Sequence, residues 1–100
     1  MKFMFSADIR SYKNMRNDEL REAFVTEPLF QAGEIVLVYT DVDRGLVGGI
    51  VPQDKPILLP THKELAADYF CQRREAGVIN IGGEGSINVD GTDYAMANRD

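Results

Sequence analysis

Residues 85–96 have the sequence GSINVDGTDYAM, which predicts a β-hairpin. Asp90 and Gly91 form the two-residue link of a type I′ turn, because both central positions of that turn need positive φ and Asp-Gly is a favoured pair there. In this register the two faces separate apolar from polar side chains, with Ile87, Val89, Tyr94 and Met96 on one face and Ser86, Asn88 and Asp93 on the other. The rest of the fold is predicted outward from this hairpin.

Four further segments are rich in β-branched and aromatic residues or lie between strong turn signals, and we expect strands at residues 34–42, 45–52, 56–59 and 76–82. The first, EIVLVYTDV, is apolar enough for a strand with both faces covered. Within the second, Gly48 and Gly49 indicate a bulge, a bend or a close backbone approach. The last strand would join the hairpin in a β meander over residues 76–96.

Two short helices are also predicted. The first follows Asn17, whose side chain can cap a helix that begins with two carboxylates, and it ends near Glu27 because Pro28 pushes the preceding residue out of the helical region. The second begins at Thr61, which forms a capping-box pattern with Glu64. Residues 1–16 are polar and lack a period, so we expect an arm whose order depends on what it lies against.

The predicted class is therefore mainly β with two short helices, in a single domain that forms a barrel or a sandwich. The predicted final strand ends at Met96 and leaves an edge that nothing in these 100 residues covers. We therefore expect the native chain to continue beyond this region, and we do not expect residues 1–100 to act as an isolated monomer.

Charge and composition exclude several classes of function. Eleven basic and sixteen acidic residues give a net charge of −5, which repels nucleic acid phosphates. No run approaches the roughly 18 apolar residues of a membrane span, and the N-terminus does not have the pattern of a signal peptide. A single cysteine excludes an internal disulfide and suits a reducing compartment, so we expect a cytoplasmic location.

The common catalytic and metal-binding patterns are weak in this sequence. The string GGEGSIN at residues 82–88 has the glycines of a turn but lacks the third glycine of a dinucleotide fingerprint. Asp41 and Asp43 do not continue into a calcium loop. His62 is the only histidine, so we expect a capping or surface role, and Cys71 follows two aromatic residues and is expected to be a buried, inert thiol.

Three arginines are the remaining candidates for a site. Arg73 and Arg74, followed by Glu75, come just before the strand predicted at residues 76–82. Arg44 lies between the strands predicted at residues 34–42 and 45–52. The simpler interpretation is that they form surface or interface ion pairs. The functional alternative is that a guanidinium binds a substrate carboxylate, because its planar fork fits that group.

Three motifs resemble one enzyme family. RREAGVINIGGEGSINVDGTDY at residues 73–94 is similar to a stretch of the 4-deoxy-L-threo-5-hexosulose-uronate ketol-isomerases, also called 5-keto-4-deoxyuronate isomerases. FVTEPLF at residues 24–30 and DRGLVGGIVP at residues 43–52 resemble the same family. The matches keep their order over about residues 20–100.

The resemblance implies a bicupin-type chain, in which residues 1–100 are an N-terminal arm and the first, non-metal cupin-like β domain, with the second barrel absent. Such enzymes interconvert 5-keto-4-deoxyuronate and 3-deoxy-D-glycero-2,5-hexodiulosonate in pectin and uronate catabolism and assemble as hexamers. Their zinc ligands, histidines and a glutamate, belong to the second barrel. We therefore expect residues 1–100 to bind no metal and to be inactive alone.

In this view the segment is a scaffold and an oligomer interface of an enzyme whose substrate is a sugar acid. Arg44, Arg73 and Arg74 match positions of the family pattern but bring no defined role with them, and the catalytic residues stay unknown. The rival interpretation is a non-catalytic small β module that binds a sugar acid or a partner subunit.

Overall fold

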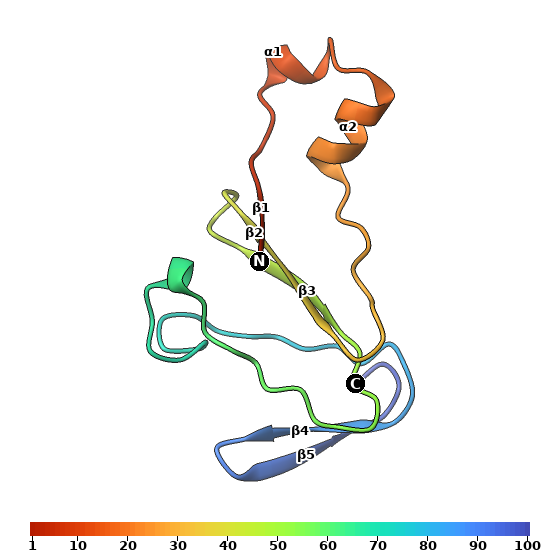
Figure 1. The fold of residues 1–100 in the computed structure, drawn as a ribbon, viewed down its shortest axis with the longest axis vertical. Helices are drawn as coiled ribbons and strands as arrows, with labels where there is room; N and C mark the ends of the chain where they lie inside the picture. Colours follow the sequence, from red (N-terminus) through yellow and green to blue (C-terminus); the bar gives the residue numbers. More distant parts are fainter.

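The computed structural model describes residues 1–100 (Figure 1). In chain order its elements are β1 (Lys2–Met4), α1 (Ile9–Tyr12), α2 (Asn17–Phe24), β2 (Ile35–Thr40), β3 (Leu46–Ile50), the 3₁₀ turn η1 (Lys63–Leu65), β4 (Gly85–Val89) and β5 (Thr92–Met96). The expected class, mainly β with two short helices, is confirmed. The strands form two small open sheets, one of three strands and one of two.

The three-stranded sheet has the order β1-β2-β3, with β2 at its centre. β1 runs parallel to β2, from Lys2 opposite Val38 to Met4 opposite Thr40. β3 runs antiparallel to β2. Val38 is only 3% exposed, which agrees with its place on the central strand. The strands expected at residues 34–42 and 45–52 are thus confirmed.

Gly48 and Gly49 mark a close backbone approach and not a bulge. Both keep the regular pairing with β2, Gly48 opposite Leu37 and Gly49 opposite Val36. A side-chain carbon on Gly49 would overlap the Leu29 carbonyl oxygen. Glycine at this position therefore allows the segment before β2 to lie directly on β3.

The N-terminal 16 residues are ordered more than the sequence indicated, because they contain β1 and α1. β1 takes its order from β2, as expected for an arm that needs a neighbour. Asp8 caps α1, since its Oδ1 accepts a hydrogen bond from the Ser11 backbone N–H at 2.6 Å. Asp41, just after β2, accepts hydrogen bonds from both the backbone N–H and the hydroxyl of Ser6, at 2.8 and 3.1 Å.

The first predicted helix forms, but both of its predicted ends are wrong. Asn17 is the first helical residue, and the cap is Arg16, whose backbone N–H donates to Glu19 Oε2 at 2.7 Å. The helix stops before Val25, whose φ of −117° and ψ of 129° are extended, well ahead of the expected end at Glu27. A β-branched residue loses side-chain freedom in a helix, and this favours the early exit.

The second predicted helix does not form. Only the 3₁₀ turn η1 is present, and Ala66 ends it with a left-handed φ of 47°. The Thr61 hydroxyl donates to the Ala67 carbonyl oxygen at 2.8 Å instead of capping a helix. Leu65 is 7% exposed, whereas Tyr69 is exposed, so no continuous apolar face directs helix formation here. Without such packing, a helix this short does not gain enough free energy to offset the cost of nucleation.

Two predicted strands are also wrong. Residues 56–59 and 76–82 have no strand structure. A strand is stabilised by its partner, and no backbone hydrogen bond joins either segment to a neighbouring strand. The expected meander over residues 76–96 is consequently reduced to its hairpin.

The hairpin itself is confirmed. Asp90 and Gly91 link β4 to β5 with φ values of 51° and 86°. The pairs that share the more apolar face are Gly85 with Met96, Ile87 with Tyr94, and Val89 with Thr92. On the other face, the Asn88 side-chain amide donates to Asp93 Oδ1 at 2.8 Å.

The core is sparse for a chain of this length. Only 3 of the 100 residues are buried. The radius of gyration is 15.9 Å, compared with about 13 Å for a compact 100-residue domain. Figure 1 shows the two helices, the three-stranded sheet and the hairpin strung out along the long axis. None of the helices combines the length and apolar character that crossing a bilayer requires.

Candidate functional site

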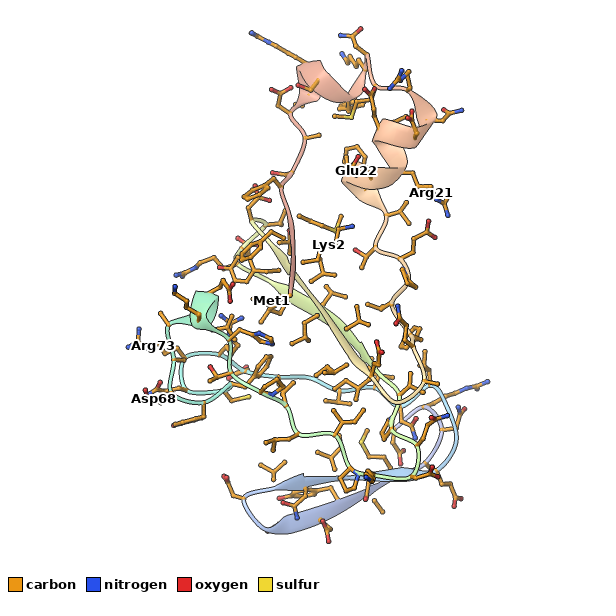
Figure 2. All side chains as sticks on the ribbon, viewed as in Figure 1. Met1, Lys2, Arg21, Glu22, Asp68 and Arg73 are labelled. Carbon is orange, nitrogen blue, oxygen red and sulfur yellow. The ribbon has the colours of Figure 1, made fainter.

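Arg73 and Arg74 lie together at the end of the turn-rich loop that follows η1. The Arg74 guanidinium carbon is 6.0 Å from the centre of the Phe70 ring, a distance at which a cation is attracted to an aromatic face. Arg73 is exposed, and Figure 2 shows it with Asp68 on the outer side of the loop. The loop is braced from within, because the Asp68 backbone N–H donates to Gln72 Oε1 at 2.7 Å.

Neither of these arginines has an acidic partner. The ion pairs of the structure are formed by other residues, Arg16 with Asp18 and with Glu19, and Arg21 with Glu27. Arg44, Arg73 and Arg74 thus form no surface ion pair within the chain, and ion pairs across an interface stay a prediction. Their N–H groups are available to an anion from outside residues 1–100.

Arg44 lies elsewhere, in the turn between β2 and β3. It has a φ of 54°, and its neighbour Asp43 has a φ of 52°, so two consecutive residues other than glycine adopt left-handed backbone conformations. Thr40 and Val42 close the turn, since the Val42 N–H donates to Thr40 Oγ1 at 3.1 Å. No hydrogen bond joins this turn to the loop that ends at Arg74. Arg44 therefore belongs to a different segment of the chain from Arg73 and Arg74.

An open groove of about 660 Å³ lies between β1 and the two helices, and the sequence did not predict it. Figure 2 shows Lys2 extending from β1 below α2, where Glu22 lies. The groove is mixed in character, and its lining residues are Lys2, Phe3, Met4, Phe5, Ser11, Asn14, Met15, Glu19, Glu22 and Ala23. The apolar run of residues 3–5 at the N-terminus was the one signal that could have indicated it.

A bidentate ion pair lies at the exit of α2. Arg21 Nε and Nη2 donate to the two carboxylate oxygens of Glu27 at 2.6 and 2.7 Å. These hydrogen bonds lower the pKa of Glu27 from its ordinary value and raise the pKa of Arg21. The pair is solvent-exposed and fixes the chain between α2 and β2, so its role is structural.

His62 and Cys71 are the remaining candidates for metal or nucleophile chemistry. His62 is half-buried just before η1, and Cys71 is exposed, so the expectation of a buried thiol is wrong. The loop around Cys71 does not form the helix that would have buried one of its faces. No group of three His, Cys, Asp or Glu side chains lies close enough to hold a metal ion. The residues of this chain therefore do not fit a zinc site.

The glycine-rich string at residues 82–88 is a turn that runs into β4, as expected. Asn80 organises it, because its side-chain amide donates to the carbonyl oxygens of Gly83 at 2.7 Å and of Met96 at 3.1 Å. Asn98 adds a hydrogen bond to the Gly82 carbonyl at 2.8 Å. These bonds hold the turn against the end of β5 and the residues that follow it.

No family model matches the chain. Curated relatives do, and each is named 4-deoxy-L-threo-5-hexosulose-uronate ketol-isomerase. The protein from Lachnoclostridium phytofermentans is 43% identical over 100 residues, all of this chain and 36% of the relative. That from Lacticaseibacillus paracasei is 49% identical over 88 residues, or 88% of this chain and 31% of the relative. That from Halalkalibacterium halodurans is 41% identical over 100 residues.

These comparisons confirm the resemblance that the sequence motifs indicated, and they extend it over the whole chain. The chain spans about a third of the length of the curated relatives it matches.

Proposed function

We propose that this chain forms the N-terminal part of a ketol-isomerase that interconverts 5-keto-4-deoxyuronate and 3-deoxy-D-glycero-2,5-hexodiulosonate in the breakdown of pectin and related polyuronides. The observation that carries the proposal is 43% identity along all 100 residues to a relative named for ketol isomerisation of a hexosulose uronate. The sequence motifs at residues 24–30, 43–52 and 73–94 lie within that aligned length.

Within this enzyme the segment is a scaffold and an oligomer interface in a cupin-like, cytoplasmic homohexamer. Two observations support this role. The chain exposes many large apolar side chains, which a longer polypeptide or further subunits would cover. It also lacks any cluster of metal ligands, so the zinc that polarises the substrate carbonyl would be held by histidines and a glutamate outside residues 1–100.

The arginines without acidic partners are the candidates for substrate contact. Arg73 and Arg74 are adjacent in sequence and have no carboxylate partner, so this pair offers two guanidinium groups to the carboxylate of a ketouronate, whereas Arg44 offers one. In this proposal they position substrate through charge and take no part in proton transfer.

A chimera tests the proposal. The aligned region of the Lachnoclostridium phytofermentans protein is replaced by this chain, and turnover of 5-keto-4-deoxyuronate, bound zinc and oligomeric state are measured beside the unmodified relative. We expect activity within about tenfold of that relative, stoichiometric zinc and a hexamer. A folded, zinc-loaded hexamer without turnover would contradict the proposal.

A binding role without chemistry is the second candidate, and the same unpaired Arg73 and Arg74 favour it. Galacturonate is added to residues 1–100 while backbone amide shifts are followed by NMR. Saturable shifts at residues 70–75, lost in an Arg73→Gln and Arg74→Gln double variant and kept in Arg16→Gln, together with an inactive chimera, would favour a sugar-acid module over an isomerase.

A further inference from the structure

Residues 76–81, AGVINI, are uncharged and, apart from Asn80, apolar, yet they lie in the open. The exposed fractions are 52% for Val78, 75% for Ile79 and 64% for Ile81. Figure 1 shows this stretch crossing the molecule as a single segment without a strand beside it. A run of this composition is typical of a strand that is covered on both faces.

The backbone of this segment is as unpartnered as its side chains. No backbone N–H or carbonyl of residues 76–79 or of Ile81 takes part in a hydrogen bond within the chain. Such a row of unpaired N–H and carbonyl groups is a template for pairing with another strand. Apolar side chains on both faces and free backbone groups along the segment describe one feature, a strand that lacks its neighbours.

The C-terminal end of the segment is fixed in place. The Asn80 backbone N–H donates to the Asp100 carbonyl oxygen at 2.7 Å, and its carbonyl accepts from Arg99. The Asn80 side chain adds the hydrogen bonds to Gly83 and Met96 described above. The segment is thus anchored beside the end of β5, and this reduces the entropy that pairing would cost.

We infer that residues 76–81 pair with a β-strand from the polypeptide that makes up the other two-thirds of the curated relatives. This inference rests on the proposed function for the identity of the occupant. Strand addition supplies what the segment lacks, backbone partners along its edge and apolar cover on its faces. An occupant strand that is itself apolar and uncharged matches the uncharged run.

The distribution of exposed apolar residues favours this occupant over a second copy of the chain. They extend from Phe3 through Phe24, Leu58 and Ile79 to Tyr94, on separate elements along the 49 Å length. A two-fold contact covers one patch, whereas a polypeptide about twice as long as this chain can reach several. Two copies would also bring together two net charges of −5.

Amide hydrogen exchange tests the inference, with residues 1–100 alone compared with the chimera that joins them to the remainder of the Lachnoclostridium phytofermentans protein. We expect the amides of Gly77, Val78, Ile79 and Ile81, which have no hydrogen-bond partner within the chain, to exchange rapidly in the 1–100 chain and at least about 100-fold more slowly in the chimera. Rapid exchange in a folded chimera would overturn the inference. Protection in a dimer of the 1–100 chain would assign the segment to a second copy and would also overturn it.

A proline series separates backbone pairing from simple apolar contact. In the chimera, Ile79→Pro removes a donor that pairing would use, Ile79→Val keeps it, and Lys55→Pro places a proline in another segment without hydrogen bonds. We expect only Ile79→Pro to abolish protection at residues 77–81. Equal protection in all three would overturn strand pairing.

Turnover of the same chimera distinguishes this inference from the proposed function. Protection at residues 77–81 without isomerase activity would leave the pairing standing and remove the function. Isomerase activity without protection at residues 77–81 would support the function and overturn the pairing.

Discussion

The β4–β5 hairpin and residues 76–81 are close neighbours in the chain, and both are rich in β-branched residues, yet only the hairpin has strand structure. The difference lies in where the partner is encoded. The hairpin carries its partner two residues away, across Asp90 and Gly91. Residues 76–81 have no pairing segment within the chain, so the same propensity produces an open segment. Strand propensity therefore describes a surface that fits a sheet and does not specify its neighbour.

The largest effect is expected at Gly91, where a substitution would disrupt the turn that pairs β4 with β5. A Gly91→Val change puts a β-branched residue at a φ of 86°, and we expect a loss of about 3 kcal/mol in hairpin stability. Cross-strand NOEs between Ile87 and Tyr94 would report it. Gly77→Val is the matched control, because Gly77 has no positive φ and nothing lies near its added carbon. Similar losses in both variants would contradict the assignment of the turn.

The three-stranded sheet combines both kinds of pairing, because β2 pairs with the nearby β3 and with the distant β1. Gly49→Ala would push a methyl group against the Leu29 carbonyl and the Phe30 ring, and we expect destabilisation of about 2 kcal/mol, as for other overpacked sites. Urea denaturation measures it. Gly83→Ala, where the added carbon meets nothing within 4 Å, is the control. A Gly49→Ala variant as stable as the parent would show that the Leu29 segment moves away freely.

A smaller effect is expected at Asn88, whose side chain makes two hydrogen bonds within the hairpin. Its Oδ1 accepts from the Gly91 N–H at 3.2 Å, and its amide donates to Asp93. Asn88→Ala removes both hydrogen bonds, and we expect a loss of about 1 kcal/mol by thermal denaturation. Ser86→Ala, on the same face of β4, should change little. If the Asn88→Ala variant had the melting temperature of the parent, these side-chain hydrogen bonds would contribute nothing measurable to the stability of the turn.

The same contrast explains which parts of the fold could be predicted. The hairpin, β2 and β3 were predictable because each strand pairs with one that lies only a few residues away along the chain. Gly48 and Gly49 indicated a close backbone approach but not which segment approaches. β1 was not predictable, since three residues show no period and their order comes from β2, more than 30 residues away. Residues 56–59 and 76–82 were predicted as strands because composition cannot show whether a partner is present.

The candidate site was predictable only as a set of residue types. The sequence indicated arginines, and Arg73 and Arg74 do lie together without acidic partners. It could not show how Arg44 lies relative to this pair, because that depends on how β2 and β3 lie relative to the loop after η1. Nor could it show that Cys71 is exposed, since that follows from a left-handed Ala66 ending a helix that the capping pattern predicted.

The smallest expected effect concerns the local ion pair at the exit of α2. Hydrogen bonds from Arg21 lower the pKa of Glu27 below its ordinary value of 4.5, so the pair's contribution to stability is present above that value and is lost as the pH falls through the lowered pKa. In Arg21→Ala the Glu27 pKa should return toward 4.5, which an NMR titration of its side-chain carboxyl carbon would detect. Arg16→Ala is the matched control, because Arg16 pairs with Asp18 and Glu19 and should leave Glu27 unchanged. Since six residues separate Arg21 from Glu27, the pair is encoded locally like the hairpin, and we expect it to persist in residues 1–100 alone. A Glu27 pKa that is lowered only in the chimera would place this contact among those that depend on the rest of a longer chain.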